Sequence, residues 1–294
     1  MSDRILYISD LDCTLLNDNS SLSAYTLETI NQLVESGLMF TFASARSLSS
    51  ASRTIQGLKL RLPVITYNGT FIQDAATGER LHSCTFTPDQ RRAVAGILES
   101  SHISPLVYAF IDGEEKLSWI SGMENPGVRH YLGNRRGDRR LHPISPEDSS
   151  CAEYGASNRT LYTGDIFYFT CIGTREEFIP VRQALNRIDG IRCSLCEEPG
   201  RPGEYWCEIM PAQASKANAV TRLKKILGAD KVITFGDAQN DQPMFEVSDE
   251  CYAVANACAQ LKQMATGIIG SNTDDGVARY LSNQWTSSNR HFIR

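Results

Sequence analysis

The chain has 294 residues, a formal net charge of -5 and a pI near 5.6, with 41% hydrophobic and 21% charged residues. This composition is typical of a folded globular protein, and the acidic balance excludes an overall basic surface that would hold a nucleic-acid backbone. No stretch approaches the roughly 18 apolar residues of a membrane-spanning helix, and the N-terminus lacks the basic and apolar regions of a secretory signal. We therefore predict a cytoplasmic protein without nucleic-acid or membrane partners, long enough for two domains.

Strand-like apolar runs alternate with helical patterns in two separate parts of the chain. The first part predicts strands at 5–9, 38–43 and 64–67, with helices at 24–36 and 49–56. The second predicts helices at 216–227, near Met244 and near Val277, with strands at 232–235 and 252–254. Such alternation is typical of βαβ units. We therefore predict that residues 1–82 and 211–294 build one α/β core, doubly wound and Rossmann-like around a mostly parallel sheet.

Residues 83–210 have a different texture, with turns rich in Gly, Pro and Ser. Strand-like runs at 106–111, 165–172 and 204–210 are interspersed with helical patterns at 87–100 and 175–188. Residues 143–150, "PISPEDSS", are predicted to be irregular. The segment is thus predicted to be an inserted α+β domain.

Two local motifs in the insertion have ordinary interpretations. The nine cysteines lack the regular spacing of a disulfide framework, which suits a reducing compartment. Cys193 and Cys196 form a single CxxC with Cys207 downstream, and buried thiols are favoured over a structural metal site. The run "RRGDRR" at 135–140 is interpreted as a solvated loop rather than a site for an anionic partner.

Polar residues follow several of the predicted core strands, where ligands bind in open α/β sheets. They are Asp10, Asp12 and Thr14 after the first strand, Ser44 and Arg46 after the second, Asn68 after the third, and Asp237, Asn240 and Asp241 after the strand at 232–235.

This set of residues suits phosphoryl transfer. Asp10 and Asp237 offer the carboxylate oxygens that Mg²⁺ prefers, and a carboxylate can also act as nucleophile by forming an aspartyl-phosphate. Asp12, two residues further along an extended chain, would protonate the leaving oxygen and then activate water. Lys216, with the hydroxyls of Thr14 and Ser44, would meet the charge on the transferring group.

Four motifs in order, "DLDCTLL", "FASAR", "SKANAV" and "GDAQNDQPMF", resemble those of the haloacid dehalogenase superfamily. Its members mostly hydrolyse phosphate monoesters through an aspartyl-phosphate with Mg²⁺. The flanking "ITYNGTFI" and "GSNTDDGVARYL" are similar to its Cof-like, type IIB subgroup, in which a large α/β cap is inserted between the second and third motifs. The resemblance covers both parts of the predicted core.

The resemblance implies a role for each matching residue. Asp10 would be the nucleophile and a Mg²⁺ ligand, and Asp12 the general acid/base with its backbone carbonyl on the metal. Asp237 would ligate Mg²⁺, with Asp241 supporting it directly or through water. The residues expected to bind the phosphate or substrate, or to orient the site, are Thr14, Ser44, Asn68, Gly69, Lys216 and Asn240.

Some positions depart from the pattern or stay open. Cys13 and Ala45 stand where the subgroup usually has Gly, and Ser44 stands for the usual Thr. For Arg46, a phosphate-side contact and a surface position at a helix start are both open.

The expected substrate is a small phosphorylated metabolite, most commonly a sugar phosphate, hydrolysed by a monomer or small homo-oligomer. The alternatives are a phosphomutase of the phosphomannomutase type and a non-catalytic regulatory or binding protein on the same fold. Cap residues set specificity in this family, and its motifs do not identify them.

Overall fold

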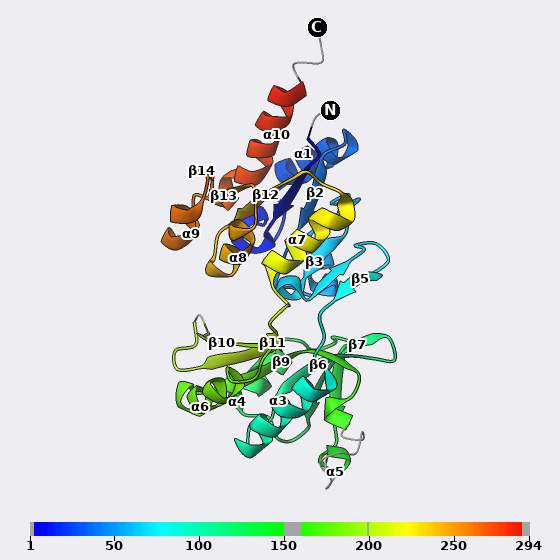
Figure 1. Ribbon diagram of the computed structural model, residues 1–294, viewed down its shortest axis with the longest axis vertical. Coiled ribbons are helices and arrows are strands. Elements are labelled where there is room, and N and C mark those ends of the chain that lie inside the picture. The colour runs from blue at the N-terminus through cyan, green and yellow to red at the C-terminus, as the bar shows by residue number, and fades with distance from the viewer. Residues whose placement is uncertain (1–2, 150–159, 199, 290–294) are drawn as a thin grey trace. The chain divides into compact units, whose positions relative to one another are not determined.

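A computed structural model describes residues 3–149, 160–198 and 200–289 of the chain (Figure 1). The chain divides into two compact units: residues 1–83 with 214–294, called the core unit below, and residues 84–213, called the cap unit. The boundaries predicted from the sequence were 82/83 and 210/211. Each unit has its own apolar cluster of buried side chains.

The core unit is built on a five-stranded parallel sheet in the order β14-β13-β12-β1-β2. The strands are β1 Ile5–Ser9, β2 Met39–Phe42, β12 Lys231–Gly236, β13 Glu250–Val254 and β14 Gly267–Ile269. The chain leaves β1 toward β2 on one side, and later leaves β12 toward β14 on the other. The direction of winding therefore reverses between β1 and β12, which lie side by side, and in open α/β sheets ligands bind beyond the carboxyl ends of such strands.

Helices cover the two faces of this sheet. They are α1 Ala24–Glu35, α2 Leu48–Thr54, α7 Lys216–Leu227, α8 Gln242–Glu246, α9 Ala259–Met264 and α10 Gly276–Asn289. α1 contacts α10, whereas α7 contacts α8 and α8 contacts α9. Because crossovers between parallel strands are right-handed, winding in two directions places these two groups on opposite faces. The doubly wound α/β core predicted from the sequence is confirmed.

The third predicted strand behaves differently from the first two. β3 Val64–Thr66 touches the parallel sheet through one bridge, Ala43 to Ile65, and then pairs antiparallel with β4 Phe71–Gln73, which pairs with β5 Arg80–Ser83. The turn Tyr67–Gly69 reverses the chain because its three residues all have positive φ angles, 50°, 52° and 97°. A three-stranded antiparallel sheet therefore follows β2, and the sequence did not predict it.

The cap unit contains a six-stranded sheet in the order β10-β11-β9-β6-β7-β8, antiparallel except for the pair β7 and β8. The strands are β6 Leu106–Ile111, β7 Glu114–Ile120, β8 Leu141–Ile144, β9 Asp165–Gly173, β10 Ile191–Glu197 and β11 Tyr205–Pro211. Helices α3 Pro88–Ser100 and α6 Arg175–Leu185 share one apolar cluster with alternate residues of the central strands. A shorter helix, α4 Pro126–Gly133, was not predicted.

The prediction that residues 143–150 are irregular was wrong for most of the segment. Pro143 and Ile144 end β8, and α5 Pro146–Ser149 follows; Ser150 lies outside the described residues. β8 is an edge strand, where a proline without an N–H group is tolerated, and Pro146 starts its helix, where no N–H group is needed.

The cysteine and arginine motifs of the cap unit have structural explanations. Cys193 and Cys196 are three residues apart on β10, so their side chains point to opposite faces of the sheet. Cys193 is buried with its Sγ 3.4 Å from that of Cys207, and both are free thiols. In the arginine run, the Cζ atom of Arg135 lies 3.4 Å from the centre of the Tyr131 ring. Arg140 forms ion pairs with Glu115 and Asp138.

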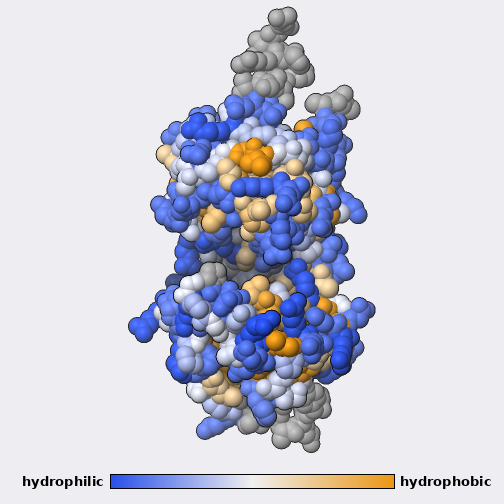
Figure 2. Space-filling view, turned by 90° about the vertical axis from the view of Figure 1, so that its left-hand side faces the viewer, coloured by the Kyte–Doolittle hydropathy of each residue, from blue (hydrophilic) through white to orange (hydrophobic). Residues whose placement is uncertain are grey.

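Figure 2 shows one face of each unit, on which hydrophilic residues predominate and apolar residues form small separate patches. Within the part of the chain that the structure describes, no helix combines the length and the apolarity needed to cross a bilayer.

Candidate active site

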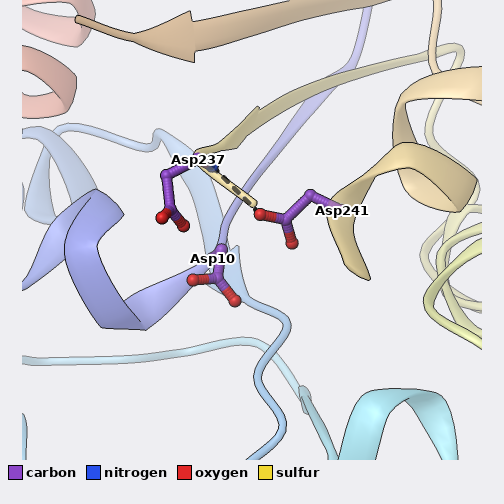
Figure 3. Close-up of side chains that lie close together, drawn as sticks. All are labelled: Asp10, Asp237 and Asp241. Carbon is purple, nitrogen blue, oxygen red and sulfur yellow. Dashed lines mark hydrogen bonds between the residues drawn. The ribbon is translucent and has the colours of Figure 1, made fainter. Parts of the chain in front are cut away.

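Three carboxylates converge beyond the carboxyl ends of β1 and β12 (Figure 3). One oxygen each from Asp10, Asp237 and Asp241 lies within 4.8 Å of the other two. Asp10 directly follows β1, and its N–H group donates to the carbonyl of Phe235 on β12 at 2.9 Å, which fixes Asp10 beside the strand that leads to Asp237. Asp241 ends the short turn Gln239–Asp241. Two strands and one turn thus bring Asp10 together with two carboxylates that lie more than two hundred residues further along the chain.

Lys216 connects two of these carboxylates. Its Nζ lies 2.5 Å from Asp10 Oδ1 and 2.6 Å from Asp241 Oδ1, and the residue is 2% exposed. Lys216 is the first residue of α7, a helix that begins there because the side chain of Ser215 accepts the N–H group of Asn218. Two of the three carboxylates therefore share one buried ammonium group.

The charges at this site shift the pKa values of its members. Burial raises the pKa of Asp10 well above its usual range; Asp241 and Asp237 raise it further, and Lys216 opposes them. Burial, followed by the charge of Asp241, raises the pKa of Asp237 to about 6. Burial lowers the pKa of Lys216, but Asp10 and Asp241 more than offset this and raise it, so Lys216 keeps its proton. The excess negative charge favours binding of a further cation.

The donor set fits a hard divalent cation such as Mg²⁺, because every candidate ligand is a carboxylate oxygen. Asp241 is already engaged at both oxygens: Oδ1 accepts from Lys216, and Oδ2 accepts the N–H groups of Asp237 at 3.0 Å and Ala238 at 3.2 Å. Asp10 and Asp237 are therefore the carboxylates best placed to bind a cation directly.

Asp12 lies outside the acidic cluster and pairs with Arg46. The Nε of Arg46 lies 2.9 Å from Asp12 Oδ2, and its Nη2 lies 2.6 Å from Asp12 Oδ1. The side chain of Arg46 is 23% exposed and that of Asp12 is 43% exposed, so water can compete for this ion pair. The sequence left Arg46 open between a phosphate-side contact and a surface position, and the structure places it on the second carboxylate of the first motif.

The remaining residues predicted for the site differ in whether they contact a carboxylate of the cluster. Thr14 is buried, and its hydroxyl donates to Asp237 Oδ1 at 3.0 Å. Ser44 is buried, and its Oγ accepts the N–H group of Arg46 at 3.1 Å. Asn68 follows β3 in a left-handed conformation, with its N–H group on the carbonyl of Ser44 at 2.9 Å. Asn240 is exposed on the turn before Asp241.

Sequence reasoning missed two residues that contact the loops of this site. Asn256 follows β13 and donates to the carbonyl of Cys13 at 2.7 Å, and Asn272 donates to the carbonyl of Leu16 at 3.1 Å. Collecting polar residues after the strand predicted at 252–254, as was done for the other core strands, would have found Asn256.

Comparison with known proteins gives the family. The sequence profile of the haloacid dehalogenase-like hydrolases matches residues 7–281. The chain belongs to this family. Among curated relatives, a 5-amino-6-(5-phospho-D-ribitylamino)uracil phosphatase of Bacillus subtilis is 29% identical, over 92% of this chain and 95% of the relative. An HMP-PP phosphatase of Serratia proteamaculans is 27% identical, over 95% of this chain and 94% of the relative.

The same fold occurs in solved structures of this family. A haloacid dehalogenase-like hydrolase from Bacteroides thetaiotaomicron superposes with a TM-score of 0.73 at 21% identity, covering 96% of this chain and 99% of the other. The haloacid dehalogenase fold inferred from the four motifs, and its Cof-like type inferred from the flanking segments, are confirmed, with a parallel-sheet core and a separate, mostly antiparallel cap.

Proposed function

We propose that this haloacid dehalogenase-like hydrolase is a Mg²⁺-dependent phosphatase that hydrolyses phosphate monoesters of small metabolites through an aspartyl-phosphate. The observation that carries the proposal is the buried placement of Asp10 between Lys216 and Asp237 at the switch point of the sheet. A buried carboxylate that is restrained by an ammonium group and ends a rigid strand is held in position to attack.

The protein's own residues account for both halves of the reaction. Asp10 attacks phosphorus and forms an acyl phosphate, while the leaving alkoxide takes a proton from Asp12 and departs as an alcohol. Water then attacks the aspartyl-phosphate, Asp12 takes up the proton of that water, and Asp10 is released with inorganic phosphate. Lys216 restrains Asp10 throughout and offsets part of the charge on the phosphoryl group.

Arg46 occupies the carboxylate of Asp12. Its Nε and Nη2 donate to both oxygens of Asp12, so Asp12 is engaged with Arg46 rather than turned to a reacting group. Donation to a leaving group requires a protonated Asp12 free of Arg46. We infer that substrate binding separates this exposed pair.

Asp10 and Asp237 would hold Mg²⁺. Asp241 would support them, because its Oδ2 accepts the N–H group of Asp237 and so fixes the backbone at that ligand. When bound, this cation neutralises charge on the phosphoryl oxygens. Thr14 fixes one oxygen of Asp237 and thereby orients that carboxylate toward the shared space.

The relatives support a small phosphorylated metabolite as the class of substrate, but they do not identify the substrate itself. Both of those described above are named as phosphatases of small phosphorylated compounds. Sugar phosphates remain the first expectation for this chain, and a phosphorylated uracil compound is suggested by the name of the Bacillus subtilis relative. A phosphomutase would share the first half-reaction but return the phosphoryl group to another carbon.

Purified protein is screened against phosphorylated metabolites with Mg²⁺ and with chelator, with free phosphate and sugar-phosphate isomers both quantified. We expect free phosphate, released only with Mg²⁺. Asp10→Asn should reduce turnover by at least about 10⁴-fold and abolish the acyl-phosphate adduct in acid-quenched intact-mass spectra, because an amide is a poor nucleophile.

Asp74→Asn is the matched control, since Asp74 lies in the core unit but only accepts hydrogen bonds within an exposed turn. Full activity of Asp10→Asn would eliminate Asp10 as nucleophile. Isomerisation without phosphate release would identify a mutase, and no turnover of any ester would favour a non-catalytic protein.

A further inference from the structure

The turn after β13 contacts both of the loops that carry the catalytic carboxylates. In this turn, Nδ2 of Asn256 donates to the carbonyl of Cys13 at 2.7 Å, within the loop that follows Asp10. Two residues later, the N–H group of Cys258 donates to the carbonyl of Asp237 at 2.8 Å. One short segment therefore holds the loop after β1 and the loop after β12 at the same time.

The carboxamide of Asn256 is itself held from behind. Its Oδ1 accepts the N–H group of Asn272 at 3.0 Å. Asn272 is buried, and its own Nδ2 donates to the carbonyl of Leu16 at 3.1 Å and to Asp18 Oδ1 at 2.9 Å. Both ends of the Asn256 side chain are therefore fixed, so its donor is aimed at one carbonyl of the first loop.

The first loop needs such support because its backbone is unusual. Within the turn Leu11–Leu15, Asp12 has an extended conformation and Cys13 a φ of +54°, which residues other than glycine rarely adopt. The subgroup that this chain resembles usually has glycine at this position. A hydrogen bond to the Cys13 carbonyl fixes the plane of the peptide group that joins Cys13 to Thr14, since that group is rigid and planar.

Fixing this peptide group has a consequence for the cation site. Thr14 follows the fixed peptide, and its hydroxyl donates to Asp237 Oδ1 at 3.0 Å. One chain of contacts leads from Asn256 through the Cys13 carbonyl to Thr14, which binds the carboxylate of Asp237. A second contact, from the N–H group of Cys258, holds the backbone carbonyl of Asp237. The position of Asp237 relative to Asp10 depends on both contacts.

We infer that Asn256 is a positioning residue, which no comparison assigns, and that it sets the cation affinity of the site by fixing the loop of Asp10 relative to Asp237. The inference rests on the proposed function in so far as that function requires the cation. It concerns the geometry of the ligands and does not require Asn256 to touch a substrate.

Asn31 provides a matched control for a purely structural role. Its Nδ2 donates to the carbonyl of Gly57 at 2.9 Å, and its Oδ1 accepts the N–H group of Lys59 at 2.7 Å. Asn31 therefore makes the same pair of backbone hydrogen bonds between segments of the core unit, at residues that contribute nothing to the carboxylate cluster. Because Asn256 is exposed, its replacement by alanine removes hydrogen bonds without leaving a buried cavity.

The test measures binding of Mg²⁺ alone to the full chain by titration calorimetry, with turnover of the best phosphate ester as a second readout. Asn256→Ala should raise the Kd for Mg²⁺ about tenfold, as expected when an outer partner of metal ligands is lost. It should also raise the Mg²⁺ concentration for half-maximal activity by the same factor, with most of kcat recovered at saturating Mg²⁺. Asn256→Gln, which can still donate to the Cys13 carbonyl, should give an intermediate Kd.

Asn31→Ala should lower the melting temperature without changing the Kd for Mg²⁺. An unchanged Kd in Asn256→Ala, or a lost kcat that saturating Mg²⁺ does not restore, would overturn the inference even if the enzyme is a phosphatase. If the wild-type protein binds Mg²⁺ but hydrolyses no ester, a weakened Kd in Asn256→Ala still supports the inference while the proposed function fails.

Discussion

Asp237 is the carboxylate of the cluster that Lys216 does not touch directly. Lys216 contacts Asp10 and Asp241, whereas Asp237 accepts a hydrogen bond from the hydroxyl of Thr14. Its pKa is raised to about 6 by burial and by the charge of Asp241. Much of the uncompensated negative charge of the site therefore falls on Asp237 when no cation is bound.

This shift predicts how stability depends on pH in the presence of chelator. A carboxyl group whose pKa is higher in the folded state binds more protons there between about pH 4 and 6, so its ionisation lowers the free energy of unfolding as pH rises through this range. Asp237→Asn cannot ionise, so this decrease in the free energy of unfolding is absent from the variant. The variant should be more stable than wild type at pH 7, by about 1 kcal/mol after allowing for solvent screening, and the difference should vanish near pH 4. Urea unfolding of both proteins in chelator at several pH values measures this difference in stability.

Asp249→Asn serves as a control with the opposite sign. The pKa of Asp249 is lowered, first by the N–H group of Val232 and then by Lys224, so ionised Asp249 stabilises the folded state at neutral pH. Asp249→Asn should therefore be less stable than wild type at pH 7, with a difference that shrinks as pH falls. A pH-independent difference for Asp237→Asn would show that its pKa is unshifted.

Some residues of the site can be predicted from sequence and others cannot, for a physical reason. Asp10 and Asp237 directly follow strands, so sheet topology alone brings them together. Arg46 reaches Asp12 through a long flexible side chain, and no strand pattern determines where such a side chain ends. The hydrogen bond from Asn256 to Cys13 depends on the exact path of two loops and likewise leaves no sequence pattern.

Among the elements, the turn between β3 and β4 packs closely against the start of α7. Gly69 has a φ of +97°, and a Cβ atom placed on it would lie 2.1 Å from the carbonyl oxygen of Ser215. Ser215 caps α7, whose first residue is Lys216. The glycine is thus required twice, for its backbone conformation and for the close approach of the turn to the start of this helix.

Gly69→Ala should destabilise the core unit and reduce activity together. Relief of the clash must move Ser215 and with it Lys216, so we expect a decrease in kcat of about 10²-fold. Gly37→Ala is the control, because Gly37 has a nearly equal φ of +102° but open space around its Cβ position. The loss of stability should be about 1–3 kcal/mol greater in Gly69→Ala than in Gly37→Ala, by denaturant unfolding. Equal losses would mean that only the backbone conformation matters at Gly69.

The sequence predicts some elements better than others because the signals differ in strength. α7 was predicted at 216–227 and occupies those residues, since Ser215 caps its start and Gly228 adopts the left-handed conformation just after its end. β4 and β14, of three residues each, were missed, whereas the equally short β3 was predicted from its apolar run. β8 was missed because prolines obscured an edge strand.

At the scale of the whole molecule, the sequence predicts an insertion because a change in texture separates two stretches of the same βαβ rhythm, and the structure divides into two compact units at 83/84 and 213/214. Each unit encloses its own apolar cluster, one around Phe40 and Phe235 and the other around Phe169 and Phe178. No such pattern in the sequence identifies residues of the cap unit that would contact a substrate.

Separate apolar clusters predict separate unfolding transitions. All three carboxylates of the candidate cation site lie in the core unit, so Mg²⁺ should stabilise that unit and leave the cap unit unchanged. Trp285 packs against the core cluster, whereas Trp119 and Trp206 lie in the cap unit, so fluorescence can follow each unit by itself. With Trp119→Phe and Trp206→Phe combined, Trp285 reports the core. With Trp285→Phe, the other two report the cap.

We expect the midpoint reported by Trp285 to rise by about 5–10 °C at Mg²⁺ concentrations roughly one hundredfold above the Kd. The midpoint reported by Trp119 and Trp206 should not move, because the described residues of the cap unit include no group of candidate metal ligands. Asp237→Asn should cancel the rise in the core midpoint without affecting the cap signal, which separates cation binding at the site from a general effect of salt. If both reporters shift together, the two units unfold as one cooperative body, and stabilising the acidic site then stabilises the sheet of the cap as well.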